Sequence, residues 1–322
     1  MKETGPEPTP AGRDSERLML YTWMVEARQF DRALCEVNPR WFPGEGEEGT
    51  VVGAFFDLNE TDIAAPHYRS PFVVYLMRGA EGWRLAAQAL GRRGGYSKGR
   101  SVPFTGPAEL NIVPWVAGDL GTSIGVAAGA ALALRDNGSG GVCICTFGDG
   151  TANRGDIHES LNLASVWNLP IVFVCQNNGW SISEPEESYL KGRVVDRALG
   201  YGMPGAVVDG QDVEAVRAAV LEATERARIG GGPSLIEART HRARGHWAAD
   251  AETYRRRDEA TPQWGDPIEV MATRLRGEGI ASQPGLDEIA IQAQAKASAY
   301  IAAARDQPEL TEADVGLGDV YP

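Results

Sequence analysis

The chain has 322 residues, and a chain of this length buries about three quarters of its unfolded surface, so it needs no disulfide or structural metal to fold. Its formal net charge of −13 argues against nucleic acid as a partner, because phosphate backbones need clustered lysine and arginine. The sequence shows no apolar run long enough to span a membrane and no apolar signal core at its start, so we expect a cytoplasmic protein without a membrane partner.

The first part of the chain is predicted to be mainly helical. Residues 1–15 are rich in proline and charge and are expected to form a disordered tail. Apolar residues at helical spacing then predict a helix from residue 16 to about residue 36. The elements expected next are a turn at 44–49, a short apolar segment at 50–56, helices at 70–79 and 83–90, a basic glycine-rich loop at 91–101 and a helix rich in small residues at 119–135.

The middle of the chain alternates strand and helix patterns. Two short apolar runs at 141–147 and 170–176 predict strands, and residues 156–167 between them predict a helix, which makes a βαβ unit with parallel strands. Further elements are expected as a strand ending at 207–210, a helix at 212–229 with Asp212 as its N-cap, a strand at 233–239, an irregular polar segment at 241–257 and a helix at 287–305. We therefore predict one α/β domain over residues 16–306, with a mostly parallel sheet flanked by helices, and a C-terminal tail at 307–322.

Polar residues follow both strands of the βαβ unit. Asp149 lies between Gly148 and Gly150 after the first strand, and Asn177 and Asn178 follow the second. Ligands bind beyond the carboxyl ends of parallel strands, so these residues meet at one edge if the strands are neighbours. Carboxylate and amide oxygens suit Mg²⁺, which keeps so small a protein shell when phosphate oxygens complete it. The pattern predicts a site for a Mg²⁺-bound phosphate or diphosphate.

Plainer interpretations exist for each residue. Asp149 alone could be an ordinary turn residue, and Asn178 alone could cap the next segment. Other phosphate signatures are absent, since the sequence contains no GxxxxGK[ST] and the glycines around Asp149 do not extend to GxGxxG. His67 and His158 have no supporting pattern and are interpreted as structural.

The sequence resembles the thiamin diphosphate motif, in which a GDG triplet is followed by a helix, a strand and then NN. More specifically, the chain from about Arg17 to Arg305 resembles the alpha subunit of the first component of 2-oxo acid dehydrogenase complexes. The motifs that carry this resemblance occur in family order: GEEGT at 46–50, HYR at 67–69, SKGR at 97–100, NNGWSIS at 177–183 and RGHW at 244–247. GEEGT and NNGWSIS are closer to the branched-chain and acetoin types than to the pyruvate type. The resemblance implies the diphosphate-binding half of a thiamin diphosphate-binding fold.

The same resemblance implies a metal and phosphate site around the GDG triplet. Asp149 and Asn178 are implied as Mg²⁺ ligands, with the backbone carbonyl of Trp180 as a third. Most family members have tyrosine where Trp180 stands, but a carbonyl ligand tolerates that change. The backbone amides of Gly150 and Thr151 are implied to contact the diphosphate of thiamin diphosphate.

Four more residues match family positions. Tyr68 and Arg69 match the pair that reaches the diphosphate, where an arginine fork suits phosphate oxygens. Gly121 matches a backbone contact to the aminopyrimidine. His246 matches the active-site histidine on the loop after the last strand, and it is expected to serve both cofactor binding and catalysis. Trp247 replaces the serine that is phosphorylated in mammalian members, so that control is not expected here.

The substrate is implied to be a small 2-oxo acid. The pyruvate type has a histidine where this chain has Trp41 and Phe42, which favours a bulkier or more apolar acyl group.

The resemblance also implies partners. A beta subunit is expected to supply the pyrimidine-binding half and the catalytic glutamate, which nothing in this chain matches, in an assembly of two alpha and two beta chains. After decarboxylation the acyl group is expected to pass to a lipoyl group on the acyltransferase component, with His246 assisting proton transfer. One alternative is a split carboligase or transketolase-like enzyme that passes the carbanion to another acceptor. Another is a regulatory subunit without activity.

Overall fold

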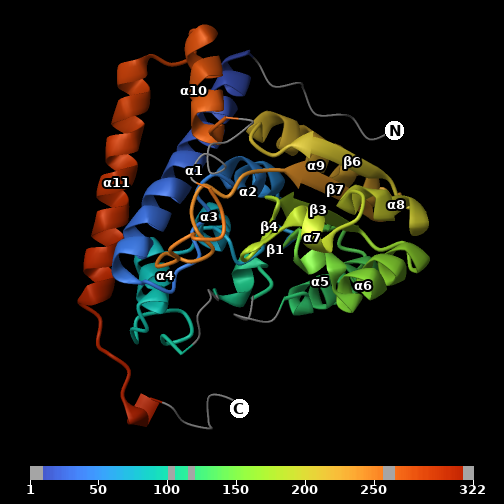
Figure 1. Ribbon diagram of the computed structural model, residues 1–322, viewed down its shortest axis with the longest axis horizontal. Coiled ribbons are helices and arrows are strands. Elements are labelled where there is room, and N and C mark those ends of the chain that lie inside the picture. Colours follow the sequence, from blue (N-terminus) through green and yellow to red (C-terminus); the bar gives the residue numbers. More distant parts are fainter. Residues whose placement is uncertain (1–9, 101–105, 115–119, 257–264, 315–322) are drawn as a thin grey trace.

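Five parallel strands form the central sheet of the computed structural model, which describes residues 10–100, 106–114, 120–256 and 265–314 (Figure 1). In spatial order the strands are β1 (Ile63–Ala65), β2 (Cys143–Gly148), β3 (Ile171–Asn177), β7 (Ser234–Arg239) and β6 (Gly205–Asp209). The predicted α/β class with a mostly parallel sheet is confirmed. Strands β2 and β3 are direct neighbours, and every residue of both is buried, as expected for strands covered on two faces.

Helices cover both faces of the sheet. They are α1 (Pro10–Val37), α2 (Glu48–Phe55), α3 (Pro71–Met77), α4 (Gly82–Ala89), α5 (Thr122–Asn137), α6 (Gly155–Val166), α7 (Glu186–Tyr189), α8 (Arg197–Gly200), α9 (Val213–Arg228), α10 (Pro267–Gly277) and α11 (Gln283–Arg305). A short antiparallel pair, β4 (Trp180–Ser181) and β5 (Glu184–Pro185), lies apart from the sheet.

The alternation of side chains along the strands separates two cores. Val172 and Val174 of β3 pack into the larger core, which is shared with α1, α2, α9 and α11. Phe173 and Cys175 of the same strand pack into the second core, which α5 and α6 cover. The period of two in a β-strand explains why one continuous apolar run serves both cores.

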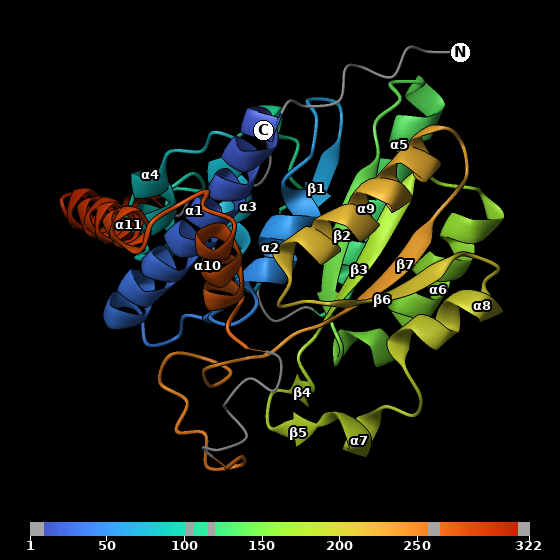
Figure 2. The same ribbon diagram turned by 90° about the horizontal axis from the view of Figure 1, so that it is seen from above.

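The outer helices form a separate group beside the sheet. Figure 2 shows α1, α10 and α11 next to one another, on the side of the molecule away from α5 and α6. Phe30 of α1 contacts Tyr300 of α11, with ring centroids 5.4 Å apart. The first and last long helices of the chain therefore pack together and enlarge the core on one side of the sheet.

Several expected boundaries are corrected. Helix α1 begins at Pro10, so residues 10–15 of the expected tail are helical, and residues 1–9 lie outside the described residues. The run after Pro10 contains no further proline to stop a helix, and Arg17 pairs with Glu214 of α9 at 2.7 Å. Helix α2 begins inside the turn expected at 44–49. Helix α11 begins at Gln283 rather than at residue 287.

The segment after α11 has contacts of its own. The backbone N–H of Arg93 donates to the carbonyl of Pro308 at 3.0 Å, and the Arg93 guanidinium pairs with Asp314 at 2.7 Å. Residues 307–314 of the expected C-terminal tail therefore contact the loop after α4, while 315–322 lie outside the described residues.

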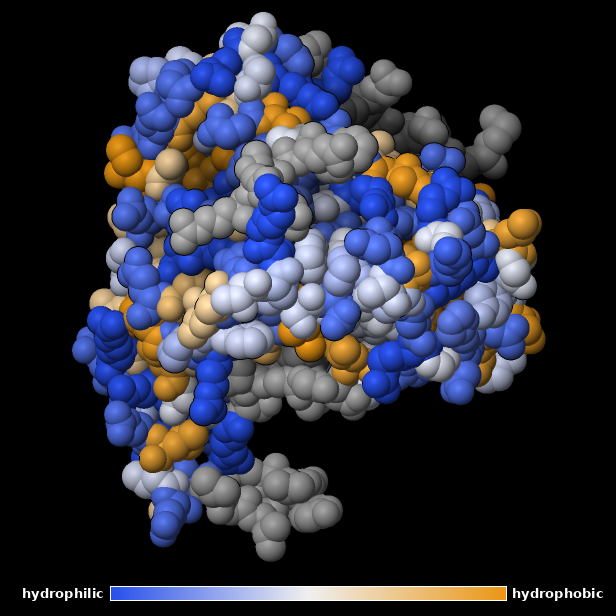
Figure 3. All heavy atoms as spheres, viewed as in Figure 1, coloured by the Kyte–Doolittle hydropathy of each residue, from blue (hydrophilic) through white to orange (hydrophobic). Residues whose placement is uncertain are grey.

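Within the ranges that the structure describes, no helix has both the length and the apolar character needed to cross a bilayer. Hydrophilic residues predominate on the face shown in Figure 3, and apolar side chains appear there as separate patches.

Candidate active site

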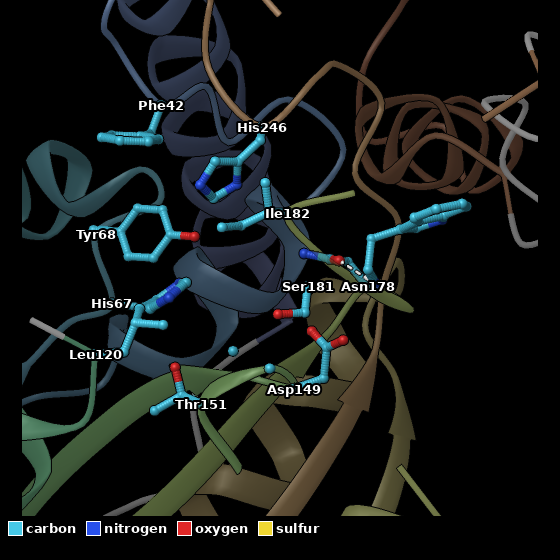
Figure 4. Close-up of a pocket in the computed structure, with 13 residues that line it drawn as sticks. Phe42, His67, Tyr68, Leu120, Asp149, Thr151, Asn178, Ser181, Ile182 and His246 are labelled. Carbon is cyan, nitrogen blue, oxygen red and sulfur yellow. Dashed lines mark hydrogen bonds between the residues drawn. The ribbon is translucent and has the colours of Figure 1, made fainter. Parts of the chain in front are cut away.

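A cavity of about 160 Å³ opens at the carboxyl ends of β2 and β3 (Figure 4). The structure brings most of the predicted site residues to its wall, and these are Tyr68, Asp149, Gly150, Thr151, Asn178, Trp180 and His246. Two predicted residues, Arg69 and Gly121, do not line it. The expectation that the ends of the two strands of the βαβ unit meet is confirmed, because β2 and β3 pair directly.

Asp149 is a buried carboxylate that directly follows β2 and lines the cavity. Only 1% of the residue is exposed, and burial raises the pKa of its carboxyl to about 6. The Tyr189 hydroxyl and the backbone N–H of Asn178 donate to it, while the nearby charge of Glu186 raises the pKa further. A buried carboxylate beside a second acid is costly unless a cation compensates it. The position of Asp149 therefore suits a metal ligand.

The two asparagines take different roles. Asn178 lines the cavity, accepts from the Trp180 backbone N–H at 3.0 Å and donates to Glu47 at 2.9 Å. Asn177 points away and donates to Glu237 of β7 at 2.8 Å. Of the two asparagines, only Asn178 lines the cavity that Asp149 also lines. In the described part of the chain, no group of three or more histidine, cysteine, aspartate or glutamate side chains is placed to hold a metal ion. A cation here would therefore rely on amide, carbonyl and ligand oxygens beside the Asp149 carboxylate, as Mg²⁺ does.

Gly150 has no side chain, and this leaves space in the cavity beside Ser181. A Cβ atom at Gly150 would lie 2.4 Å from the Ser181 hydroxyl, so a side chain would fill the space between the two wall segments. Thr151 begins a single 3-10 turn that separates β2 from α6. Leu120 lines the cavity where Gly121 was expected to act. Gly121 instead occupies the N-cap position before α5, with a φ of 94°.

Arg69 lies behind the wall rather than in it. Only 1% of the residue is exposed, and its Nε lies 3.3 Å from a Glu47 oxygen, close enough for an ion pair. Its Nη1 donates to the Pro43 carbonyl at 2.6 Å. Burial raises the pKa of Glu47 to about 7, against the opposing charge of Arg69. Because Glu47 also accepts from Asn178, this buried acid joins Arg69 to the proposed metal site.

Aromatic rings form the wall opposite Asp149. The Phe42 ring centroid lies 5.2 Å from those of both Tyr68 and His246. Burial, followed by the charges of Arg69 and Arg242, lowers the pKa of His246 to about 3. The imidazole is therefore neutral near pH 7.

The hydrogen bond from Arg69 fixes the tautomer of His246. Arg69 Nη2 lies 3.2 Å from His246 Nδ1. Arginine can only donate, so Nδ1 accepts and the neutral ring carries its hydrogen on Nε2. His246 can thus donate a hydrogen bond from Nε2.

Backbone hydrogen bonds position the His246 loop. The N–H of Ala243 donates to the Glu45 carbonyl at 2.9 Å, and the N–H of Ala248 donates to the Trp41 carbonyl at 2.7 Å. The His246 N–H donates to Asp250 at 2.7 Å. The loop is held on both sides of His246 against a segment two hundred residues earlier in the sequence.

Sequence reasoning missed several wall or support residues, namely Glu47, His67, Leu120, Ser181 and Ile182. Glu47 lies in the glycine-rich run GEGEEG, which indicates a turn and gives no sign that two of its acids, Glu47 and Glu48, are fully buried. His67 stands next to the predicted Tyr68 and Arg69, and that adjacency was the available signal.

Comparison with known proteins agrees with this geometry. A family model described as "Dehydrogenase E1 component" matches residues 16–313. The chain is 38% identical to the alpha subunit of acetoin:2,6-dichlorophenolindophenol oxidoreductase of Bacillus subtilis, over 76% of each chain. It is 35% identical to the alpha subunit of 3-methyl-2-oxobutanoate dehydrogenase of Mycobacterium tuberculosis, over 90% of this chain and 78% of the relative. It is 33% identical to the alpha subunit of the pyruvate dehydrogenase E1 component of Rhizobium meliloti, over 84% and 80%.

Proposed function

The chain belongs to the dehydrogenase E1 component family, whose members use thiamin diphosphate, and we propose that it is the alpha subunit of a heteromeric 2-oxo acid dehydrogenase. The observation that carries this proposal is the meeting of Asp149, Gly150 and Asn178 in one cavity at adjacent strand ends. The names of the relatives, which are dehydrogenases and oxidoreductases, favour this function over a split carboligase. The intact cavity wall argues against a subunit that binds no cofactor.

The donor set fits Mg²⁺ and a diphosphate. Asp149, Asn178 and the Trp180 carbonyl would hold the metal ion. The backbone at Gly150 and Thr151 and the Tyr68 hydroxyl would contact the phosphates. Arg69 would act mainly through Tyr68 and His246, because its guanidinium is already engaged with Glu47 and Pro43.

The residues of this chain would orient the cofactor and donate hydrogen bonds rather than form covalent bonds. When bound, the cofactor supplies the carbon nucleophile and the electron sink for decarboxylation. His246, neutral and hydrogen-bonded through Nδ1, would donate a hydrogen bond from Nε2 to negative charge that develops on the substrate oxygen in the acyl-transfer step. Phe42 and Ile182 line the cavity with apolar surface, which favours an apolar acyl group.

The rest of the active site would come from other chains. The relatives are named as alpha subunits, which implies a beta subunit. We propose that the beta subunit supplies the pyrimidine-binding half and the catalytic glutamate, in an assembly of two alpha and two beta chains. A lipoyl-bearing acyltransferase component would accept the acyl group.

The first test is calorimetric titration of thiamin diphosphate with Mg²⁺ into this chain, alone and with its beta subunit. We expect tight binding by the pair and weak binding by the chain alone. Asp149→Ala should lose Mg²⁺-dependent binding by at least about 100-fold while its circular dichroism spectrum stays unchanged, because the residue lies at a strand end. Asp136→Ala, an exposed control, should bind normally. Unchanged affinity in Asp149→Ala would refute the metal assignment.

A second experiment identifies the acceptor. The pair is supplied with a 2-oxo acid and then with either a lipoyl domain or an aldehyde. Acylation of the lipoyl domain supports the dehydrogenase, whereas carbon–carbon bond formation with the aldehyde alone would indicate the carboligase.

A further inference from the structure

Glu47 is a fully buried acid behind the wall of the cavity. It is not among the residues that line the cavity, so its carboxylate does not contact a ligand there. It occupies the N-cap position of α2, but its side chain makes no capping hydrogen bond to that helix. A buried carboxylate is costly unless hydrogen bonds and an opposite charge compensate it. The partners of Glu47 therefore indicate what the acid does.

These partners come from two separate segments of the chain. Oε2 of Glu47 accepts from Gln176 Nε2 at 3.0 Å, and Oε1 accepts from Asn178 Nδ2 at 2.9 Å. The same Oε1 lies 3.3 Å from Arg69 Nε. One oxygen atom thus contacts both a residue of the proposed metal site and the arginine that lies behind the cavity wall.

The contact with Glu47 decides which way the Asn178 amide points. Because Oε1 of Glu47 faces the positive charge of Arg69, it accepts, and the amide NH₂ of Asn178 must face it. The Trp180 backbone N–H can only donate, so the amide oxygen must face that group, at 3.0 Å. A flipped amide would lose both hydrogen bonds. The fixed orientation leaves a second lone pair on the Asn178 oxygen for a cation.

Arg69 carries the contact to the other side of the cavity. Its Nη1 donates to the Pro43 carbonyl at 2.6 Å, and its Nη2 lies 3.2 Å from His246 Nδ1. The guanidinium group is planar and rigid, so an ion pair at Nε helps to set the position of Nη2. Figure 4 shows Asn178 and His246 at the same cavity, and Glu47 and Arg69 connect them from behind.

We propose that Glu47 is a positioning residue, which holds the Asn178 amide and, through Arg69, the His246 ring in the orientations that the reaction needs. This inference rests on the proposed function. A substitution at Glu47 should therefore disturb two properties together, namely the binding of Mg²⁺ beside Asn178 and the tautomer of His246. An acid that merely stabilises the fold would change neither property.

Glu48 provides a matched comparison. It is also fully buried, and it pairs with Arg28 at 2.7 Å. Neither Glu48 nor Arg28 lines the cavity. Substitution of either glutamate by glutamine removes one buried ion pair with an arginine, and only the pair of Glu47 connects to Asn178 and His246.

The first measurement on Glu47→Gln concerns the metal ion. Calorimetry follows the binding of thiamin diphosphate over a Mg²⁺ series in the complex with the beta subunit. We expect the Mg²⁺ concentration needed for binding to rise about 10- to 100-fold, as for other residues that hydrogen-bond to a metal ligand.

The second measurement concerns the tautomer of His246 and needs no cofactor. Nuclear magnetic resonance of the full chain with isotope-labelled histidine shows which ring nitrogen carries the hydrogen. His246→Gln identifies the signal among those of the four histidines. The wild type should carry the hydrogen on Nε2, because Arg69 donates to Nδ1. In Glu47→Gln the tautomer with the hydrogen on Nδ1 should appear as well, because Arg69 is no longer held by the acid.

Controls separate this role from loss of stability and from the function on which it rests. Glu48→Gln should be destabilised in urea unfolding but should keep the wild-type Mg²⁺ dependence and tautomer. If Glu47→Gln does not fold, Glu47→Asp, which withdraws the carboxylate by one methylene, is measured with the same expectation. Two unchanged properties, a change in only one of them, or equal changes in Glu48→Gln would overturn the role of Glu47. Failure of the wild-type pair to bind thiamin diphosphate overturns the proposed function instead, and the tautomer measurement tells the two failures apart.

Discussion

Burial and two nearby arginine side chains keep His246 uncharged. Burial and the charges of Arg69 and Arg242 lower its pKa to about 3, from about 6.5 in an unfolded chain. Below pH 6.5 the unfolded chain therefore binds a proton that the folded chain does not. The contribution to stability is complete above pH 6.5 and is lost as the pH falls, by up to about 1.4 kcal/mol per pH unit.

This difference can be measured by urea unfolding at pH 7 and pH 5. We expect His246→Gln to lose less stability than the wild type between the two pH values, because the substitution removes the titrating group. Trp247→Leu alters the same loop without removing a titrating group and should keep the wild-type difference. An equal loss in His246→Gln and the wild type would show that His246 is not held neutral.

Tyr189 orients Asp149. Its hydroxyl donates to the Asp149 carboxylate from the short helix α7. Residues that hydrogen-bond to a metal ligand typically contribute about 10- to 100-fold to metal affinity. We expect Tyr189→Phe to raise the Mg²⁺ concentration needed for thiamin diphosphate binding by about this factor, as measured by calorimetry over a Mg²⁺ series. Ser188→Ala, on the same helix, should leave it unchanged. A Tyr189→Phe variant with normal Mg²⁺ dependence would contradict this role.

At the level of secondary structure, one aspartate joins two helices. Asp212 caps α9 by accepting from the N–H groups of Glu214 and Ala215, each at 3.1 Å. Its carboxylate also pairs with Arg274 of α10, at 2.5 and 2.7 Å. Loss of an N-cap costs about 1 kcal/mol, and an ion pair this exposed adds at most about 1 kcal/mol.

The two contributions can be separated by substitution. We expect Asp212→Ala to lower the free energy of unfolding by about 1–2 kcal/mol. Asp212→Asn keeps the capping oxygen and should lower it by less than about 1 kcal/mol. Urea unfolding measures both. Equal losses in the two variants would mean that the ion pair, rather than the cap, carries the stability.

Elements with a strong local pattern were predictable from the sequence. Strands β2 and β3 are continuous apolar runs, and Asp212 marked the start of α9. Helix α10 carried usable signals that were overlooked, since Asp266 accepts from the N–H of Ile268 at 2.9 Å and Pro267 occupies the first turn. Strand β1 has three residues and is too short to give a pattern. Its place in the sheet is set by pairing with β2.

The residues of the candidate site also differ in how well the sequence predicts them. Asp149 and Asn178 were predictable because each directly follows a strand that the sequence indicates. Glu47 was not, because its role depends on neighbours far away in the sequence, and His67 had only its adjacency to Tyr68 and Arg69 as a signal. Glu47 is defined by contacts with Arg69 and Asn178, and His67 by its place over Gly148. Such contacts arise only once the whole chain has folded.

At the scale of the whole molecule, the cavity depends on one crossing, where two segments that are far apart in the sequence pack against each other. The loop that carries His246 lies against residues 39–45, through hydrogen bonds from Ala243 and Ala248. Arg242 extends this contact, since its guanidinium donates to the Ile182 carbonyl at 2.8 Å. The aromatic wall therefore reaches the Asp149 side of the cavity only while this crossing holds.

Gly46 lies at the closest point of the crossing. It has a φ of 98°, and a Cβ there would lie 2.3 Å from the carbonyl oxygen of His241. We expect Gly46→Ala to push the His246 loop outward, because that obstacle is backbone and cannot rotate away. Hydrogen exchange should then be faster at the amides of Ala243 and Ala248, whose acceptors lie across the crossing. Cofactor binding by the pair should weaken in parallel.

Gly79 provides the matched control for this substitution. Its φ is 92°, but a Cβ there meets nothing within 4 Å. Gly79→Ala therefore suffers only the backbone strain of a positive φ, about 1–2 kcal/mol, and should leave exchange in the His246 loop unchanged. If both variants lose stability equally and neither changes the exchange of Ala243 and Ala248, the loop is held by its own internal contacts. In that case the crossing does not set the position of His246.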